Sequence, residues 1–136
     1  MTDNGLRATL ERAIEGLVYS SESDRPFAFV RFDGTSVPVA QLTADEVAAL
    51  ADSLGADTTE LSLDEFLTRH IERVDVLDVE SQRLIPRYEE LRDTLRRTLG
   101  HVRVFRMGVT EIRCVVLGND PSTGELVGIE TVAIET

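Results

Sequence analysis

The chain has 136 residues, of which 42% are hydrophobic and 29% are charged, so it is long enough for one compact domain, 1–136, and too short for two ordinary ones. Fourteen basic residues, all of them arginine, oppose 25 acidic ones, and the formal net charge of −11 disfavours binding to nucleic acid or to an anionic membrane surface. The single cysteine, Cys114, excludes an internal disulfide and a cysteine-based zinc cluster.

The N-terminal part is predicted to form a helix followed by a strand. Apolar residues recur at helical spacing through residues 6–17, and Gly16 is a typical helix stop. After the polar turn at 20–24, aromatic and branched residues in 26–32 predict a strand buried on both faces. No apolar run approaches the roughly 18 residues of a membrane span, so we expect a soluble, cytoplasmic protein.

The middle of the chain is predicted to be helical. Residues 43–46 and 62–65 are capping boxes, in which a glutamate follows a threonine or a serine by three positions, and each box marks a helix start. A longer helix follows, with Pro86 at its first turn or at a kink and Gly100 as its stop. Its apolar stripe consists of Leu84, Tyr88, Leu91, Leu95 and Leu99.

The last third is predicted to form three strands, at 101–108, 110–118 and 126–136, with a turn at 119–124. Strands joined by such short connections form an antiparallel meander. Because the order is helix, strand, helices and then three strands, we expect an α+β fold. The sheet needs cover on both faces, which favours a three-layer α/β/α sandwich.

The residues with chemical potential do not form a recognisable catalytic pattern. His70 and His101 lie outside any metal-binding spacing, and we interpret them as structural or surface histidines. Cys114 alternates with apolar neighbours on a strand, which is typical of a small buried side chain. Phosphate-binding loops and nucleophile elbows are missing from the sequence, and the abundant carboxylates are scattered. No cofactor is expected.

Two short segments stand out. The turn Ser21-Glu22-Ser23 presents one carboxylate between two hydroxyl groups, and Glu135-Thr136 directly follows a strand-forming run. From spacing alone, the first is an ordinary loop and the second a frayed end.

Residues 16–34 and 102–136 resemble the nuclease A inhibitor family. The resemblance rests on four patterns, in order along the chain: G-L-x-x-x-S-E-S-x-x-P-F from Gly16, R-x-G-x-x-E from Arg106, G-x-L-x-G-I from Gly124, and the terminal E-T. Residues 35–83 resemble the family mainly in length and helix placement.

This resemblance implies a fold like that of the pathogenesis-related-1 proteins and no catalytic activity. It implies one-to-one binding, by a free form that is a monomer, to a Mg²⁺-dependent ββα-metal endonuclease that cuts DNA and RNA. Glu22 then pairs with a catalytic-site arginine of the nuclease, and Thr136 reaches towards its metal through the metal's water shell. The residues expected around these two contacts are Ser21, Ser23, Asp75, Val76 and Glu135.

One departure concerns Val76, which stands where a family member carries a tryptophan; this chain has no tryptophan. Tryptophans are common at the energetic centres of interfaces, so the difference bears on the partner or the affinity. Two other functions are left open. One is a non-catalytic acidic binding module on the same scaffold, directed at a different basic partner or toxin. The other is a small hydrolase that uses His70 or His101.

Overall fold

The central element of the fold is a five-stranded antiparallel sheet in the order β3-β7-β6-β5-β4. Its strands are β3 (Ala28–Phe32), β4 (Thr58–Leu61), β5 (Arg103–Met107), β6 (Glu111–Asn119) and β7 (Leu126–Ile134). A separate two-stranded sheet, β1 (Val18–Ser20) with β2 (Asp24–Pro26), precedes β3. The structure is a computed structural model that describes residues 2–53, 55–73 and 78–135.

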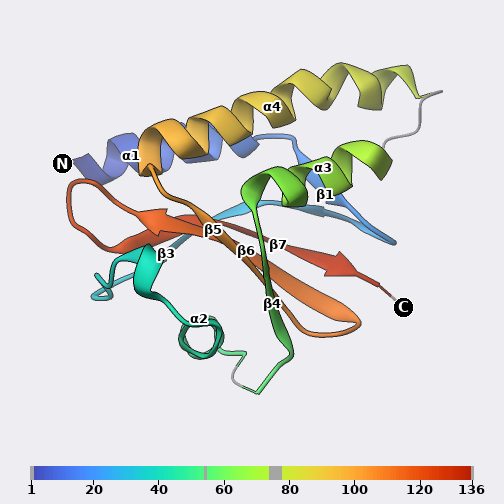
Figure 1. Cartoon of the computed structure of the whole chain (residues 1–136). Helices are drawn as coiled ribbons and strands as arrows, with labels where there is room; N and C mark the ends of the chain where they lie inside the picture. Colours follow the sequence, from blue (N-terminus) through green and yellow to red (C-terminus); the bar gives the residue numbers. More distant parts are fainter. Residues whose placement is uncertain (1, 54, 74–77, 136) are drawn as a thin grey trace.

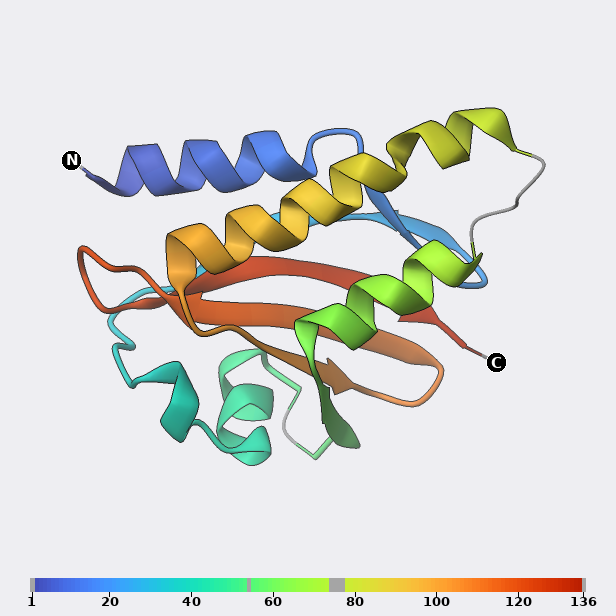
Figure 2. The same cartoon turned by 45° about the horizontal axis from the view of Figure 1, so that its top comes forward.

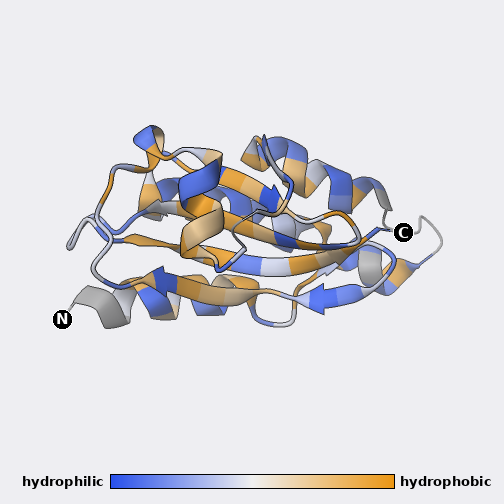
Figure 3. Cartoon of the chain, turned by 90° about the horizontal axis from the view of Figure 1, so that it is seen from below, coloured by the Kyte–Doolittle hydropathy of each residue, from blue (hydrophilic) through white to orange (hydrophobic). Residues whose placement is uncertain are grey.

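Helices cover both faces of this sheet (Figures 1 and 2). They are α1 (Thr2–Ile14), the 3₁₀ turn η1 (Val39–Gln41), α2 (Ala44–Leu50), α3 (Leu63–Arg73) and α4 (Val79–Leu99). Ile112, Cys114 and Val116 of β6 pack with α1, α3 and α4 on one face. Val115 and Leu117 pack with η1 and α2 on the other. In Figure 3, seen from the α2 side, hydrophobic segments run along the strands between these helices.

Much of the predicted secondary structure is confirmed. The fold is α+β, and β5, β6 and β7 form the predicted antiparallel meander. Both capping boxes exist: Thr43 and Glu46 exchange side chain-to-backbone bonds at the start of α2, and Ser62 and Glu65 do so before α3. Cys114 is fully buried, as its place in the strand predicts.

The prediction for the first long strand was wrong in part. β3 begins at Ala28, which is exposed, and the residues after it are half-buried rather than buried on both faces. The physical reason is that β3 is an edge strand, so its outer side meets solvent instead of another strand. Of the two positions expected for Pro86, the first helical turn is wrong, because the residue lies inside α4.

An arginine on β3 attaches the β6–β7 turn to the edge of the sheet. Arg31 donates to Asp120 Oδ2 at 2.9 Å and to Glu125 Oε1 at 2.8 Å. Burial raises the pKa of Asp120, but bonds from the Ser122 N–H and from Arg31 outweigh it, so the pKa is lowered. The pKa of Glu125 is also lowered, by bonds from the Gly34 N–H and from Arg31.

We therefore expect acid to weaken the fold through this cluster. Carboxylates with a lowered pKa in the folded state contribute stability that is fully present above their unfolded pKa of about 4. That contribution is lost as the pH falls through the folded value. Urea unfolding at pH 7 and pH 3 should show that Asp120→Asn lowers stability at pH 7 and reduces the loss on acidification. Equal acid losses in the two proteins would contradict this assignment.

Candidate partner-binding surface

The segment Ser21-Glu22-Ser23 forms the turn between β1 and β2. Ser21 donates twice to the carbonyl oxygen of Ser23, from its backbone N–H at 3.2 Å and from its hydroxyl at 3.1 Å. Arg25 of β2 donates to the Ser23 hydroxyl at 3.0 Å. Glu22 is exposed at the middle of this turn, where its carboxylate can reach a partner.

The β1–β2 turn is attached to the hydrophobic core through β1. Tyr19 of β1 is 1% exposed and stacks on Phe66 of α3, with ring centroids 4.5 Å apart. The Tyr88 hydroxyl of α4 donates to the Val18 carbonyl at 2.6 Å and accepts from the Val18 N–H at 3.2 Å. These contacts fix β1 against two helices, so the position of Glu22 is set by the hydrophobic core.

The same turn contacts the end of β7, although Ser21 and Ile134 are 113 residues apart in sequence. The Ile134 N–H donates to Ser21 Oγ at 2.9 Å, and the Glu22 N–H donates to the Ile134 carbonyl at 3.1 Å. Figures 1 and 2 show the β1–β2 turn beside this end of the chain. We call residues Ser21, Glu22, Ser23, Ile134 and Glu135 the turn-and-terminus surface.

Glu135 makes its own contacts on the side of β7 where β6 and β5 lie. Its N–H donates to the Thr110 carbonyl at 2.9 Å, and its carboxylate accepts from Arg106 at 2.5 Å. The Arg106 side chain is only 14% exposed and comes from β5, next to Cys114 of β6. The end of β7 is therefore held from the turn on one side and from β5 and β6 on the other.

The sequence predictions for this surface have different outcomes. The structure brings Ser21, Glu22 and Ser23 together with Glu135 at one end of the molecule. Asp75, Val76 and Thr136 lie outside the described residues, so their roles stay predictions. The C-terminal end of α3 lies at the same end of the molecule in Figures 1 and 2. Sequence reasoning missed the Arg106–Glu135 ion pair, although Arg106 opens one of the family patterns.

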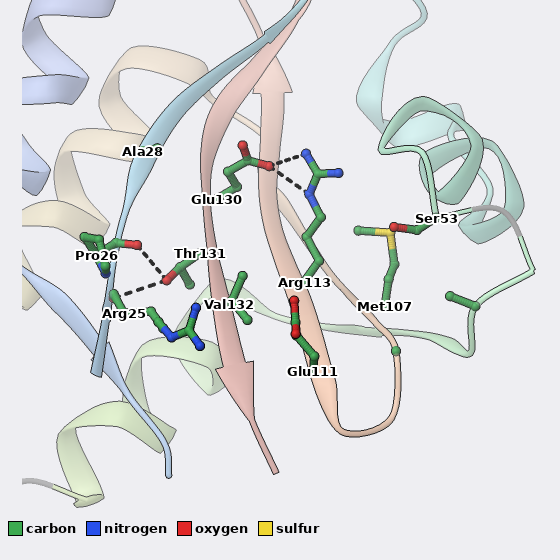
Figure 4. A pocket seen from close by; sticks show the side chains of 12 residues that line it. Arg25, Pro26, Ala28, Ser53, Met107, Glu111, Arg113, Glu130, Thr131 and Val132 are labelled. Atoms are coloured by element: carbon green, nitrogen blue, oxygen red, sulfur yellow. Dashed lines mark hydrogen bonds and ion pairs between the residues drawn. The ribbon is translucent and has the colours of Figure 1, made fainter. Parts of the chain in front are cut away.

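A groove of about 610 Å³ lies on the α2 side of the sheet, near this surface (Figure 4). Its charged side chains are partly paired with one another, because Arg113 donates to Glu130 Oε1 at 2.5 and 2.9 Å. Arg113 also donates to the Ala51 carbonyl. Arg25 and Glu111 complete the charged lining. The groove therefore contains the Arg113–Glu130 ion pair and is lined by both positively and negatively charged side chains.

The cysteine and the two histidines are the other side chains considered for chemical reactivity. Burial raises the pKa of the Cys114 thiol and outweighs the opposite effect of nearby Arg106, so the thiol stays protonated at neutral pH. His70 is buried with its ring 4.1 Å from that of Tyr88, measured between centroids. His101 is exposed. Within the described ranges, no three metal-ligating side chains gather into a site, and no helix could span a bilayer.

Comparison with known families gives a match. The family described as nuclease A inhibitor-like protein matches residues 4–136, which is nearly the whole chain. A search of curated proteins finds no significant match.

Proposed function

The chain belongs to the nuclease A inhibitor-like family, and from this premise we propose that it inhibits a Mg²⁺-dependent, sugar-non-specific endonuclease of the ββα-metal type. Membership implies nuclease inhibition in general and a non-enzymatic role. The proposal adds the type of nuclease and the manner of binding: the turn-and-terminus surface enters the active-site cleft in a one-to-one complex.

One observation carries this proposal. The Ser21–Ile134 and Glu22–Ile134 hydrogen bonds place the exposed residue Glu22 beside the end of β7. An active-site cleft that binds a phosphodiester near a metal ion has to offer positive charge at neighbouring points. Glu22 and the chain end together can supply oxygen ligands at two such points, which a single surface carboxylate cannot do.

The charge of the whole chain supports the same conclusion. A non-specific nuclease binds the phosphate backbone with arginines and a metal ion, so its cleft attracts a protein with a net charge of −11. Long-range attraction of this kind speeds association and is weakened by salt. Specificity has to come from a desolvated pair, for which Glu22 with an active-site arginine is the proposed example.

The other residues have supporting roles in the proposal. Thr136 approaches the metal site of the nuclease through the metal's water shell, because hard cations prefer oxygen ligands. The residues that flank these two contacts are Ser21, Ser23, Asp75, Val76 and Glu135. We further propose that the free protein is a cytoplasmic monomer with the three-layer arrangement of the pathogenesis-related-1 proteins. The hydrophobic cores on both faces of the sheet support that arrangement.

The test is a titration of plasmid cleavage by a ββα-metal nuclease in Mg²⁺ and low salt. The unaltered chain should inhibit stoichiometrically. Removal of Thr136 should weaken inhibition about 10- to 100-fold, since hydrogen bonds to charged groups contribute about 1.5–3 kcal/mol. Thr136→Val should lose as much, because it keeps the shape of the side chain and lacks the hydroxyl.

Thr136→Ser is the matched control, because it retains the hydroxyl and should inhibit like the unaltered chain. Equal inhibition by the valine and serine variants would show that the hydroxyl has no part in binding. If the unaltered chain in excess leaves every such nuclease active, the proposal is wrong. Capture of a basic protein other than a nuclease would then favour the alternative binding module.

A further inference from the structure

The hydroxyl of Ser21 occupies a special place at the end of the sheet. β3 pairs with β7 only as far as Ala28 opposite Glu130, so the last residues of β7 have no β3 partner on that side. The Ser21 hydroxyl accepts from the Ile134 N–H at 2.9 Å and donates to the Ser23 carbonyl at 3.1 Å. The hydroxyl therefore links Ile134 of β7 to Ser23, the residue that follows Glu22.

We propose that Ser21 is a positioning residue, whose hydroxyl joins the Glu22 turn to the end of β7 so that both meet a nuclease as one pre-formed unit. This inference rests on the proposed function. A turn that is already ordered loses less conformational freedom on binding than a loose one, so pre-ordering increases affinity without a new contact. Ser21 thus acts through Glu22 rather than through its own contact with the partner.

The contacts on the β6 side of β7 distinguish the positioning of Glu22 from a general role of Ser21 in stabilising β7. The Glu135 N–H is bonded to the Thr110 carbonyl, and the Glu135 carboxylate is paired with Arg106. These bonds do not involve Ser21, so the end of β7 keeps its β5 and β6 contacts when the hydroxyl is removed. Ser21→Ala removes the two hydroxyl bonds and leaves the backbone bond from the Glu22 N–H to the Ile134 carbonyl, so it loosens the turn that contains Glu22 rather than the strand.

Ser122 offers a control of the same chemistry outside the turn-and-terminus surface. It is exposed in the turn that precedes β7, at the other end of this strand from Ile134. Ser21→Ala and Ser122→Ala remove the same atom. We expect Ser21→Ala to weaken nuclease inhibition about tenfold and Ser122→Ala by less than about threefold.

The decisive measurement is a double-mutant cycle in the full chain, with inhibition constants for Ser21→Ala, Glu22→Ala and the double variant. If Ser21 positions Glu22, its replacement has little further effect once Glu22 is alanine. If Ser21→Ala weakens inhibition equally with Glu22 present and with Glu22 replaced by alanine, the inference is overturned. That result is expected when Ser21 only stabilises the fold, because fold stabilisation does not depend on the Glu22 carboxylate. Inhibition by Ser21→Ala at the unaltered level would overturn it too.

Amide hydrogen exchange in the free protein gives a second readout. The Ile134 amide should exchange at least about tenfold faster in Ser21→Ala, while the Glu135 amide, bonded to Thr110, should keep its rate. An unchanged Ile134 rate would contradict the proposed link. If the unaltered chain does not inhibit, the proposed function fails and this inference falls with it. If the unaltered chain inhibits and Ser21→Ala matches it, the inference alone fails.

Discussion

Replacement of Glu22 by alanine is expected to cause the largest loss of inhibition of any single substitution in this chain. In the proposed complex, the carboxylate forms a desolvated pair with an arginine of the nuclease. Truncation of one partner in such a pair costs about 2–5 kcal/mol, or roughly 30-fold to several thousand-fold in Kd. Most of this cost arises because the other charge is left buried and unpaired. The measurement is the inhibition constant against plasmid cleavage at fixed salt.

Two control variants separate the local pair from the overall charge. Glu90 is exposed on α4, and Glu90→Ala makes the same change in net charge away from the turn, so it should alter inhibition less than about threefold. Glu22→Gln keeps the size of the side chain and should lose nearly as much as Glu22→Ala. Because Glu22 is exposed, urea unfolding should change little in these variants. Equal inhibition constants for Glu22→Ala and Glu90→Ala would show that Glu22 contributes only through the net charge and not through a specific pair.

A substitution of Gly128 is expected to have the largest effect on stability. Gly128 lies in β7, opposite Val30 of β3 and Leu117 of β6. A Cβ atom at this position would overlap the carbonyl oxygen of Val116 and lie 2.8 Å from its carbonyl carbon. Backbone of a central strand cannot move aside as a flexible side chain can. Gly128→Ala should therefore lower the free energy of unfolding by about 3 kcal/mol, at the upper end for overpacking.

Gly5 in α1 provides a control with the opposite sign. A Cβ there would have no atom within 4 Å, and alanine stabilises an exposed helix by about 0.5–1 kcal/mol relative to glycine. Urea unfolding should thus place Gly5→Ala above the unaltered chain and Gly128→Ala well below it. A Gly128→Ala midpoint close to the unaltered one would mean that β6 and β7 can separate without cost.

The features that the sequence predicts well are those determined by nearby residues. Both helix starts follow from a serine or threonine and a glutamate three positions later, and the buried strands follow from alternation around Cys114. β1, β2 and β4 have only three or four residues each, too short for a periodic pattern to appear. The exposure of β3 depends on its place at the sheet edge, which is a property of the whole topology.

The candidate site also has one part that the sequence predicts and one part that only the structure reveals. The resemblance identifies Ser21-Glu22-Ser23 and the C-terminal residues as separate motifs, and the family match confirms the relationship. The hydrogen bond between Ser21 and Ile134 joins residues 113 positions apart, and no local pattern could predict it. The glycines of two family patterns acquire a physical meaning only in three dimensions. Like Gly128, Gly108 has no room for a Cβ, in its case because of the backbone of Glu111.

The place of β7 in the sheet has a consequence for the synthesis of this protein. Among the helices and strands that the structure describes, β7 comes last in sequence, yet it lies between β3 and β6. Until β7 has emerged from the ribosome, β3 lacks the neighbour with which it pairs in the described sheet, and Ser21 lacks Ile134 beside it. Completion of the sheet depends on a contact between distant parts of the chain, which is a slow kind of folding step. The nascent chain thus acquires its turn-and-terminus surface only after β7 has left the ribosome.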